Sequence, residues 1–171
     1  MNADRLRHMA SILRAPLPPD VVGFNMLYYV AEVEQVDLDG ETEDPDEFEK
    51  MTATAFREDT PACGTICCAM GLAGLDPKFQ AEGLVWDKVR GKFIVGGQEH
   101  LYGEAAAEKF FDIAWEDADT LFGPACALYL DYDADETQTP VDPLDVAAVI
   151  EHYANTGRLV HVSQIHAGVA A

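Results

Sequence analysis

The sequence predicts a mainly α (α+β) fold: a compact helical domain with one small β-hairpin. Apolar residues recur at helical spacing in several segments, and Pro and Gly mark the ends of those segments. One short stretch of β-branched and aromatic residues surrounds a glycine turn. Because 171 residues with 49% hydrophobic content suffice to bury a core, a single domain over residues 1–171 is expected.

The N-terminal segment, residues 3–15, is predicted to be a helix that Pro16 ends. Its apolar stripe consists of Leu6, Met9, Ala10 and Leu13. Three arginines decorate its other faces: Arg5, Arg7 and Arg14. A solvated face is the favoured interpretation of these arginines, and a small contact patch is the alternative.

An extended entry at residues 21–24 is expected to lead into a second helix behind Asn25, which can cap it. Residues 32–49 then hold ten carboxylates and no Lys or Arg, so residues 32–47 are predicted to form an exposed acidic loop. The loop ends at a further predicted helix, in which Asp44 is the N-cap and Pro45 the first residue.

Small residues dominate the segment CGTICCAMGLAG, residues 63–74. It predicts a short helix that Thr65 caps and Gly74 ends. Because its side chains lack bulk, this helix is expected to pack closely against its neighbours. Further along, residues 84–97 predict the β-hairpin, with Arg90 and Gly91 in its turn.

Two helical segments are expected in the C-terminal half, over residues 103–122 and 143–155. The second has the clearest ends, because Asp142 can cap it, Pro143 can open it and Gly157 follows it. Its predicted stripe is Val146, Val149, Ile150 and Tyr153. Residues 162–171 are expected to form a loose C-terminal tail.

The charge balance narrows the choice of partners. With 31 acidic and 11 basic residues the net charge is −20, which disfavours direct binding to nucleic acids and anionic membranes and favours a protein partner with a basic surface. The chain has no apolar run long enough to span a bilayer and no secretion signal, so a cytoplasmic location is expected.

Three of the four cysteines lie within six residues, at Cys63, Cys67 and Cys68. The favoured interpretation is small buried side chains in a reducing compartment. Alternatively, Cys63 is a nucleophile beside a helix N-terminus, with His100, His152 or His161 as its general base. Zinc binding is weaker, because a structural zinc site usually needs a second pair of ligands at short spacing.

Asp131, Asp133 and Asp135, together with Asp142, match the carboxylate positions of a calcium-binding loop. Glu136 stands where the tight turn of such a loop requires glycine, and Asp142 is shorter than the usual bidentate Glu. An acidic surface loop is therefore favoured, and no metal or cofactor is expected.

The segments FNM and CGTICCAMG resemble the FNM…CGTxxCxxG signature of a group of uncharacterised bacterial and phage-associated proteins. The matched positions are Phe24, Asn25, Met26, Cys63, Gly64, Thr65, Cys68 and Gly71. The resemblance covers most of residues 24–157, although Tyr28 and Tyr29 stand where tryptophan often follows FNM. It implies a compact cytoplasmic fold and an accessory role related to phages or mobile elements, and no particular activity.

The leading hypothesis for function is therefore an acidic cytoplasmic protein that acts by binding another protein. Its charged surfaces would be residues 32–49 and 131–136. The alternative is a thiol-dependent hydrolase that uses Cys63 with a histidine base.

Overall fold

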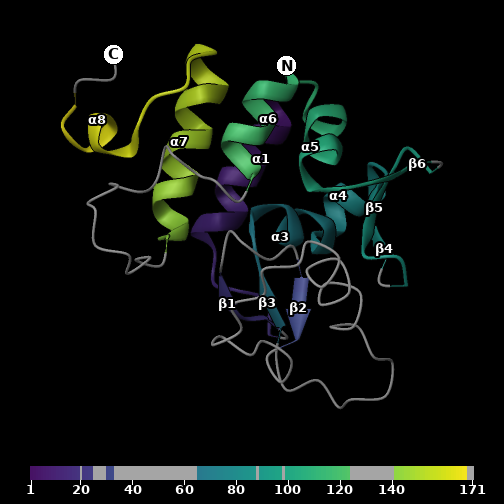
Figure 1. Ribbon diagram of the computed structural model, residues 1–171. Coiled ribbons are helices and arrows are strands. Elements are labelled where there is room, and N and C mark those ends of the chain that lie inside the picture. Colours follow the sequence, from purple (N-terminus) through teal and green to yellow (C-terminus); the bar gives the residue numbers. More distant parts are fainter. Residues whose placement is uncertain are drawn as a thin grey trace, which may run out of the picture.

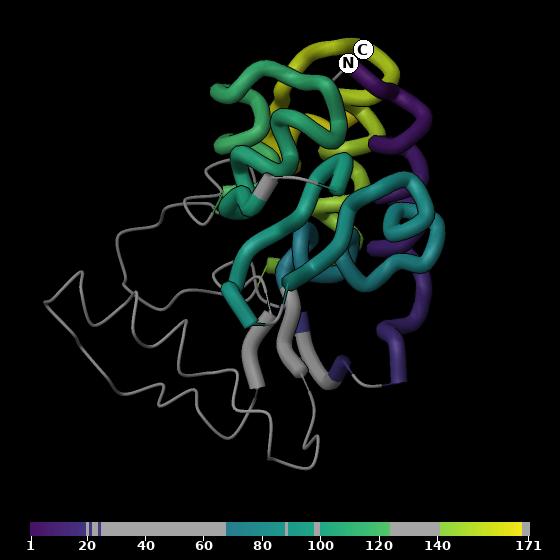
Figure 2. Tube along the Cα trace, turned by 90° about the vertical axis from the view of Figure 1, so that its right-hand side faces the viewer, coloured from purple at the N-terminus to yellow at the C-terminus, as the bar shows by residue number. Residues whose placement is uncertain are grey.

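The structure is a computed structural model, which describes residues 1–19, 21–24, 30–32, 65–87, 89–97, 99–123 and 141–168. Within these residues the helices are α1 (Ala3–Arg14), α3 (Ala69–Leu75), α4 (Pro77–Ala81), α5 (Gly103–Phe111), α6 (Trp115–Phe122), α7 (Pro143–Thr156) and α8 (Val162–His166). The strands are β1 (Val21–Phe24), β2 (Val30–Glu32), β3 (Thr65–Cys67), β4 (Leu84–Asp87), β5 (Lys92–Val95) and β6 (Glu99–Leu101). The predicted mainly α (α+β) fold class is confirmed, and Figures 1 and 2 show β1, β2 and β3 at the end of the molecule opposite α5 and α6.

Helix α1 forms the centre of the fold. Its predicted stripe is buried as expected, and the helix packs against α3, α5 and, along most of its length, α7. The side chain of Asn2 caps it by accepting a hydrogen bond from the backbone N–H of Arg5 at 3.1 Å. This amphipathic helix therefore packs between α3, α5 and α7.

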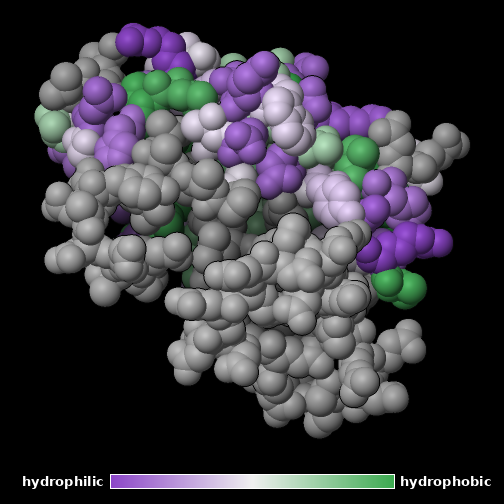
Figure 3. Space-filling model, in the orientation of Figure 1, coloured by the Kyte–Doolittle hydropathy of each residue, from purple (hydrophilic) through white to green (hydrophobic). Residues whose placement is uncertain are grey.

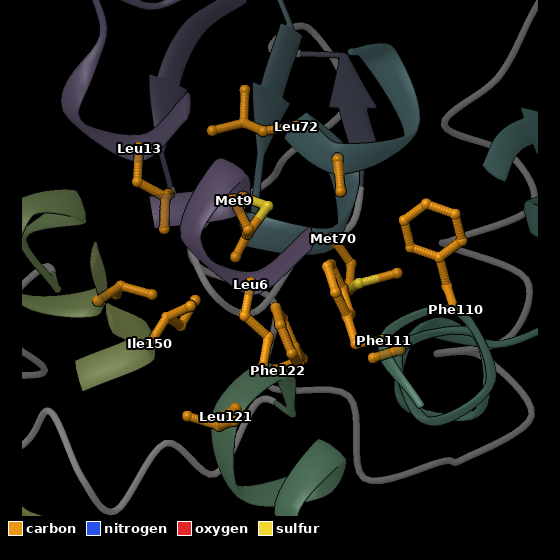
Figure 4. Packing of buried hydrophobic residues seen from close by; sticks show 14 of the residues in the cluster. Leu6, Met9, Leu13, Met70, Leu72, Phe110, Phe111, Leu121, Phe122 and Ile150 are labelled. Carbon is orange, nitrogen blue, oxygen red and sulfur yellow. The ribbon is translucent and has the colours of Figure 1, made fainter. Parts of the chain in front are cut away.

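The core between these helices is rich in aromatic rings. Side chains from α1, α3, α5, α6 and α7 converge in it, as Figure 4 shows for Leu6, Met70, Phe111, Phe122 and Ile150. The rings of Phe111 and Phe122 are stacked, with their planes 2° apart and their centroids 5.1 Å apart. Dense packing of this kind supplies most of the stability of a small domain, because apolar area is removed from water and voids are excluded.

Sheet A, formed by β1, β3 and β2 in that order, was not predicted. Strand β1 runs parallel to β3, and β2 runs antiparallel to it. The predicted helix behind Asn25 is wrong for residues 30–32, which form β2, and Thr65 lies in β3 rather than capping a helix. Pairing with distant strands outweighed the local helical spacing in these short segments.

Helix α3 begins three residues later than predicted, because its N-cap is Cys68 rather than Thr65, and it extends through Gly74 to Leu75. The expected close packing is present: a Cβ atom on Gly74 would lie 2.8 Å from the Phe93 ring and 3.3 Å from the Trp86 Cβ. Only glycine therefore lets α3 approach β4 and β5 this closely.

The predicted hairpin is formed by β4 and β5, with Gly91 at a positive φ of 61° in the turn. A third strand, β6, pairs with β5 and completes sheet B. Leu84, Trp86, Phe93 and Val95 face the core, so the alternation of buried and outward residues is regular. The sequence had predicted two of these three strands.

The single helical segment expected over residues 103–122 is two helices, α5 and α6. Asp112 ends α5 in the left-handed conformation at a φ of 53°. Helix α7 has the predicted N-cap Asp142, the predicted Pro143 and a left-handed Gly157 at its end. The predicted loose tail over residues 162–171 differs from the structure at α8, where Val162 is buried and the helix packs against α7.

Candidate functional site

Cys68 is a buried structural residue. Its side chain is fully buried, and its Sγ accepts a hydrogen bond from the backbone N–H of Gly71 at 3.4 Å, which caps α3. A thiol in this position fills space and satisfies a helix end. This agrees with the favoured interpretation of the cysteine cluster for Cys68, whereas Cys63 and Cys126 lie outside the described residues.

The two halves of the resemblance signature are brought together in sheet A. Phe24, the first residue of FNM, is paired in register with Cys67 across the parallel strands β1 and β3. Because β1 and β3 are parallel, their C-terminal ends lie at the same end of the sheet. Asn25, Met26 and Gly64 lie outside the described residues.

Burial of Cys68 predicts selective alkylation. In the native protein we expect iodoacetamide to leave Cys68 unmodified, and in denaturing guanidinium chloride we expect full modification, because the sulfur is reached only when α3 leaves the core. Peptide mass spectrometry of the residue 68 peptide measures this directly. Alkylation of Cys68 at equal rates in both conditions would contradict a packing role.

The three histidines predicted as possible bases have different surroundings. His100 Nδ1 lies 3.4 Å from Asp87 Oδ2 across sheet B. His161 uses Nδ1 to accept a hydrogen bond from the backbone N–H of Ser163 at 3.2 Å, so it caps α8. His152 lies in α7 and is half-buried. The Asp87 carboxylate beside His100 is the kind of neighbour that orients a general base.

The carboxylate that orients His100 is itself held by a cation. Arg90 donates to Asp87 Oδ2 at 2.8 Å, and the backbone N–H of Val89 donates to Asp87 Oδ1 at 3.0 Å. The hydrogen bond from the Arg90 side chain is the main reason that the pKa of Asp87 lies below its usual value of 3.8. Asp87 therefore stays ionised beside His100 at neutral pH.

Replacement of Asp87 tests this electrostatic arrangement. A carboxyl whose pKa is lowered by folding stabilises the protein above the unfolded-state pKa and loses that contribution as the pH falls through the folded-state value. We expect the thermal midpoint of the wild type to fall more steeply than that of Asp87→Asn as the pH is lowered below about 4. If the thermal midpoints of the two proteins fell in parallel as the pH was lowered, Arg90 would contribute nothing to stabilising the ionised Asp87 carboxylate.

A second His–Asp pair, which the sequence did not indicate, joins α1 to α4. His8 Nε2 lies 3.1 Å from Asp76 Oδ1, and Asp76 also caps α4 by accepting from the backbone N–H of Phe79. Ser11 Oγ lies 3.4 Å from His8 Nδ1, but it donates to the His8 carbonyl at 2.6 Å. The Ser11 hydroxyl donates its hydrogen bond within its own helix, which makes it a poor nucleophile. The contact between His8 and Asp76 therefore serves to hold α1 and α4 together.

Arg7 and Arg14 are exposed, as the favoured interpretation of a solvated face predicts, but all three arginines of α1 contact acceptors of the same chain. Arg5 Nε lies 2.7 Å from a Glu82 carboxylate oxygen, and Arg14 Nη2 lies 2.6 Å from one of Glu151. Arg7 contacts Asp4 within its own helix and donates to Asn155 of α7. These cations bind carboxylates and amides of the same chain, which leaves them poorly placed to recruit a partner.

The proposed calcium loop falls mostly outside the described residues, which include only Asp142 of its four carboxylates. The Asp142 carboxylate accepts a hydrogen bond from the backbone N–H of Leu144 at 2.8 Å and so caps α7. In the described part of the chain, no group of three or more His, Cys, Asp or Glu side chains is arranged to hold a metal ion.

Comparisons with protein-family models, with curated proteins and with solved structures found no match to this chain. Among the helices of the described segments, none has both the length and the apolar content required to cross a bilayer.

Proposed function

We propose that this chain is an acidic cytoplasmic protein that acts by binding another protein through a basic surface on that partner. The net charge of −20 carries the proposal. A surplus of this size attracts cationic surfaces and repels nucleic acids, so it favours protein partners of opposite charge. The resemblance to phage-associated proteins supports an accessory role related to phages or mobile elements.

The distribution of charge among the described residues supports this proposal. Glu108, Glu116 and Asp119, on α5 and α6, are exposed and have no ion-pair partner within the described segments. The arginines of α1, by contrast, contact acceptors of the same chain. The acidic side chains of α5 and α6 therefore remain available to a partner, whereas the arginines of α1 already bind acceptors of the same chain.

Ionic strength provides the test. We expect partners captured from a cell extract at low salt to be released at high salt, because screening shortens the reach of exposed charges to about 3 Å at 1 M salt. The double variant Glu116→Lys with Asp119→Lys should capture less of the same partners. Identical retention at both salt concentrations, by both proteins, would contradict an electrostatic mode of binding.

The second candidate is a thiol-dependent hydrolase with Cys63 as nucleophile and His100 as base. The orientation of His100 by Asp87 favours His100 over His152 and His161 for this role. In such an enzyme Cys63→Ala would abolish hydrolysis of p-nitrophenyl acetate, and His100→Gln would slow it by about 10²–10⁴-fold. His152→Gln is the matched control and should keep full activity. Equal rates for wild type and Cys63→Ala would eliminate this candidate.

A further inference from the structure

Helix α6 carries an exposed tryptophan beside two exposed carboxylates. The three side chains are neighbours on the helix surface, because residues three and four positions apart in a helix lie on the same side, and we call them the Trp115 face: Trp115, Glu116 and Asp119. We propose that the Trp115 face binds an arginine-bearing, extended segment of a partner protein, with one guanidinium group over the indole ring. This inference rests on the proposed function and assigns the basic partner to one place on the molecule.

Trp115 is much the more exposed of the two tryptophans. It is 45% exposed, whereas Trp86 is 8% exposed and its ring lies 4.8 Å from the ring of Phe93. The side of α6 that packs into the core is formed by other residues, Ala118, Leu121 and Phe122. A large aromatic side chain that stays in contact with water is typical of binding surfaces, where tryptophan is enriched.

The surroundings of Trp115 are acidic. Residues 103–122, which include α5 and α6, hold six carboxylates and one cation, Lys109. Two of these carboxylates are held by other groups: Asp112 lies 3.0 Å from the N-terminal amine, and Asp117 accepts a hydrogen bond from α7. Figure 3 shows hydrophilic side chains on the part of the surface that α6 occupies in Figure 1.

Glu116 and Asp119 have no ion-pair partner among the residues that the structure describes. Because they lie three positions apart on α6, their like charges repel each other across one turn. The positive end of the helix dipole favours Glu116 in the first turn, but Asp119 lies beyond that turn. A cation beside both carboxylates would offset the repulsion, so the charge of the Trp115 face is complementary to a basic ligand.

The indole ring favours arginine over lysine. A guanidinium group is planar, is less strongly hydrated than an ammonium group and stacks on aromatic rings, and it can donate two hydrogen bonds to one carboxylate. In an extended segment, alternate side chains lie on one side about 7 Å apart. This spacing is close to the distance of about 5–6 Å between neighbouring side chains on a helix surface, so two arginines can reach the ring and the carboxylates together.

Fluorescence anisotropy with the whole chain provides the first test. The probe is a fluorescein-labelled octapeptide of alternating Arg and Ser, and the reference is the same peptide with Lys in place of Arg. We expect the Arg peptide to bind more tightly than the Lys peptide, and we expect its binding to weaken as salt is raised. Equal binding of the two peptides would overturn the proposal.

A substitution that leaves the charge unchanged isolates the contribution of the ring. Trp115→Leu should weaken binding of the Arg peptide by about tenfold, within the range of a partly desolvated cation–π contact. Tyr102→Leu is the matched control, because it removes another exposed ring, and it should bind like the wild type. Thermal unfolding monitors folding of both variants. Equal losses in the two variants would contradict binding at Trp115.

Two pairs of substitutions separate this inference from the proposed function. Glu116→Gln with Asp119→Asn should weaken binding of the Arg peptide by about tenfold or more. Glu41→Gln with Glu43→Gln removes the same charge from the acidic run of the sequence and should have a smaller effect. A loss in the second pair alone would overturn this inference and leave the proposed function standing. Failure of the wild type to bind either peptide at low salt would count against both.

Fluorescence quenching tests the location on the unaltered chain. Unlabelled Arg peptide should protect the exposed Trp115 from acrylamide, while the buried Trp86 contributes little to the quenching. Unchanged quenching at saturating peptide would show that the peptide binds elsewhere. Sedimentation velocity covers the remaining occupant: a concentration-dependent dimer that Trp115→Leu dissolves would assign the Trp115 face to a second copy of the chain and overturn the proposed partner.

Discussion

Replacement of Phe111 by Ala is expected to lower the free energy of unfolding by about 3–5 kcal/mol, the usual cost of truncating a fully buried Phe. The ring stacks on Phe122 and makes edge contacts with Phe79 and Phe110, at centroid separations of 5.8 and 5.2 Å for the latter two. The cavity would lie where α5 and α6 meet the rest of the core, between rings from α4, α5 and α6. Urea unfolding measures the loss.

Leu144→Ala is the matched control, because Leu144 is 55% exposed. We expect this control to change the unfolding free energy by less than about 0.5 kcal/mol. The urea dependence of Phe111→Ala should keep the wild-type slope, since the surface exposed on unfolding hardly changes. A loss below about 1 kcal/mol for Phe111→Ala would show that the aromatic cluster is not packed as described.

Replacement of Tyr153 by Phe is expected to cost about 1.5–3 kcal/mol at neutral pH, the range for a hydrogen bond to a charged group. The Tyr153 side chain is 4% exposed, and its hydroxyl donates to Asp117 Oδ2 at 2.5 Å. This bond joins α7 to α6 and leaves the Asp117 carboxylate without its donor when the hydroxyl is removed. Tyr102→Phe, at an exposed position, should have little effect.

The same variant is expected to change the response to alkali. Burial, reinforced by the Asp117 carboxylate, raises the pKa of Tyr153 far above its ordinary value of 10.0. A raised pKa in the folded state means that the stabilisation is complete below about pH 10 and is lost as the pH rises further. The stability difference between wild type and Tyr153→Phe should therefore shrink above about pH 10. A constant difference would contradict the hydrogen bond to Asp117.

The helices with strong local signals were predicted closely. In α7, Asp142 offers a cap, Pro143 opens the helix without losing a hydrogen bond, and Gly157 adopts the left-handed turn at its end. In α1, the four apolar residues at helical spacing are the four that are buried. The hairpin was also predicted, because the positive φ of Gly91 satisfies a turn between two β-prone segments.

The features that were missed depend on distant partners. Strand β3 is held by β1 and β2, whose residues come from about forty positions away in the sequence, and nothing within residues 65–67 indicates which strands they pair with. The left-handed Asp112 that separates α5 from α6 lies within a continuous helical pattern. The pairing of His8 with Asp76 joins residues 68 positions apart.

For the candidate sites too, the sequence indicated the residue types, and only the fold decided their neighbours. The sequence named Cys68 as one of a cysteine cluster and His100 as one of three possible bases, but it could not say what either side chain contacts. The fold buries the sulfur of Cys68 at the start of α3 and places His100 beside Asp87, from another strand of sheet B.

By itself, the sequence determined the ends and buried faces of α1 and α7, the turn of the hairpin and the surplus of negative charge, because capping, periodicity and net charge depend on residues close together or on simple sums. Only the tertiary structure decided which strands pair in sheet A, which carboxylates hold the arginines of α1, and which residues surround His100. These contacts join segments far apart in the chain, and their energies exist only once the fold has brought the partners together.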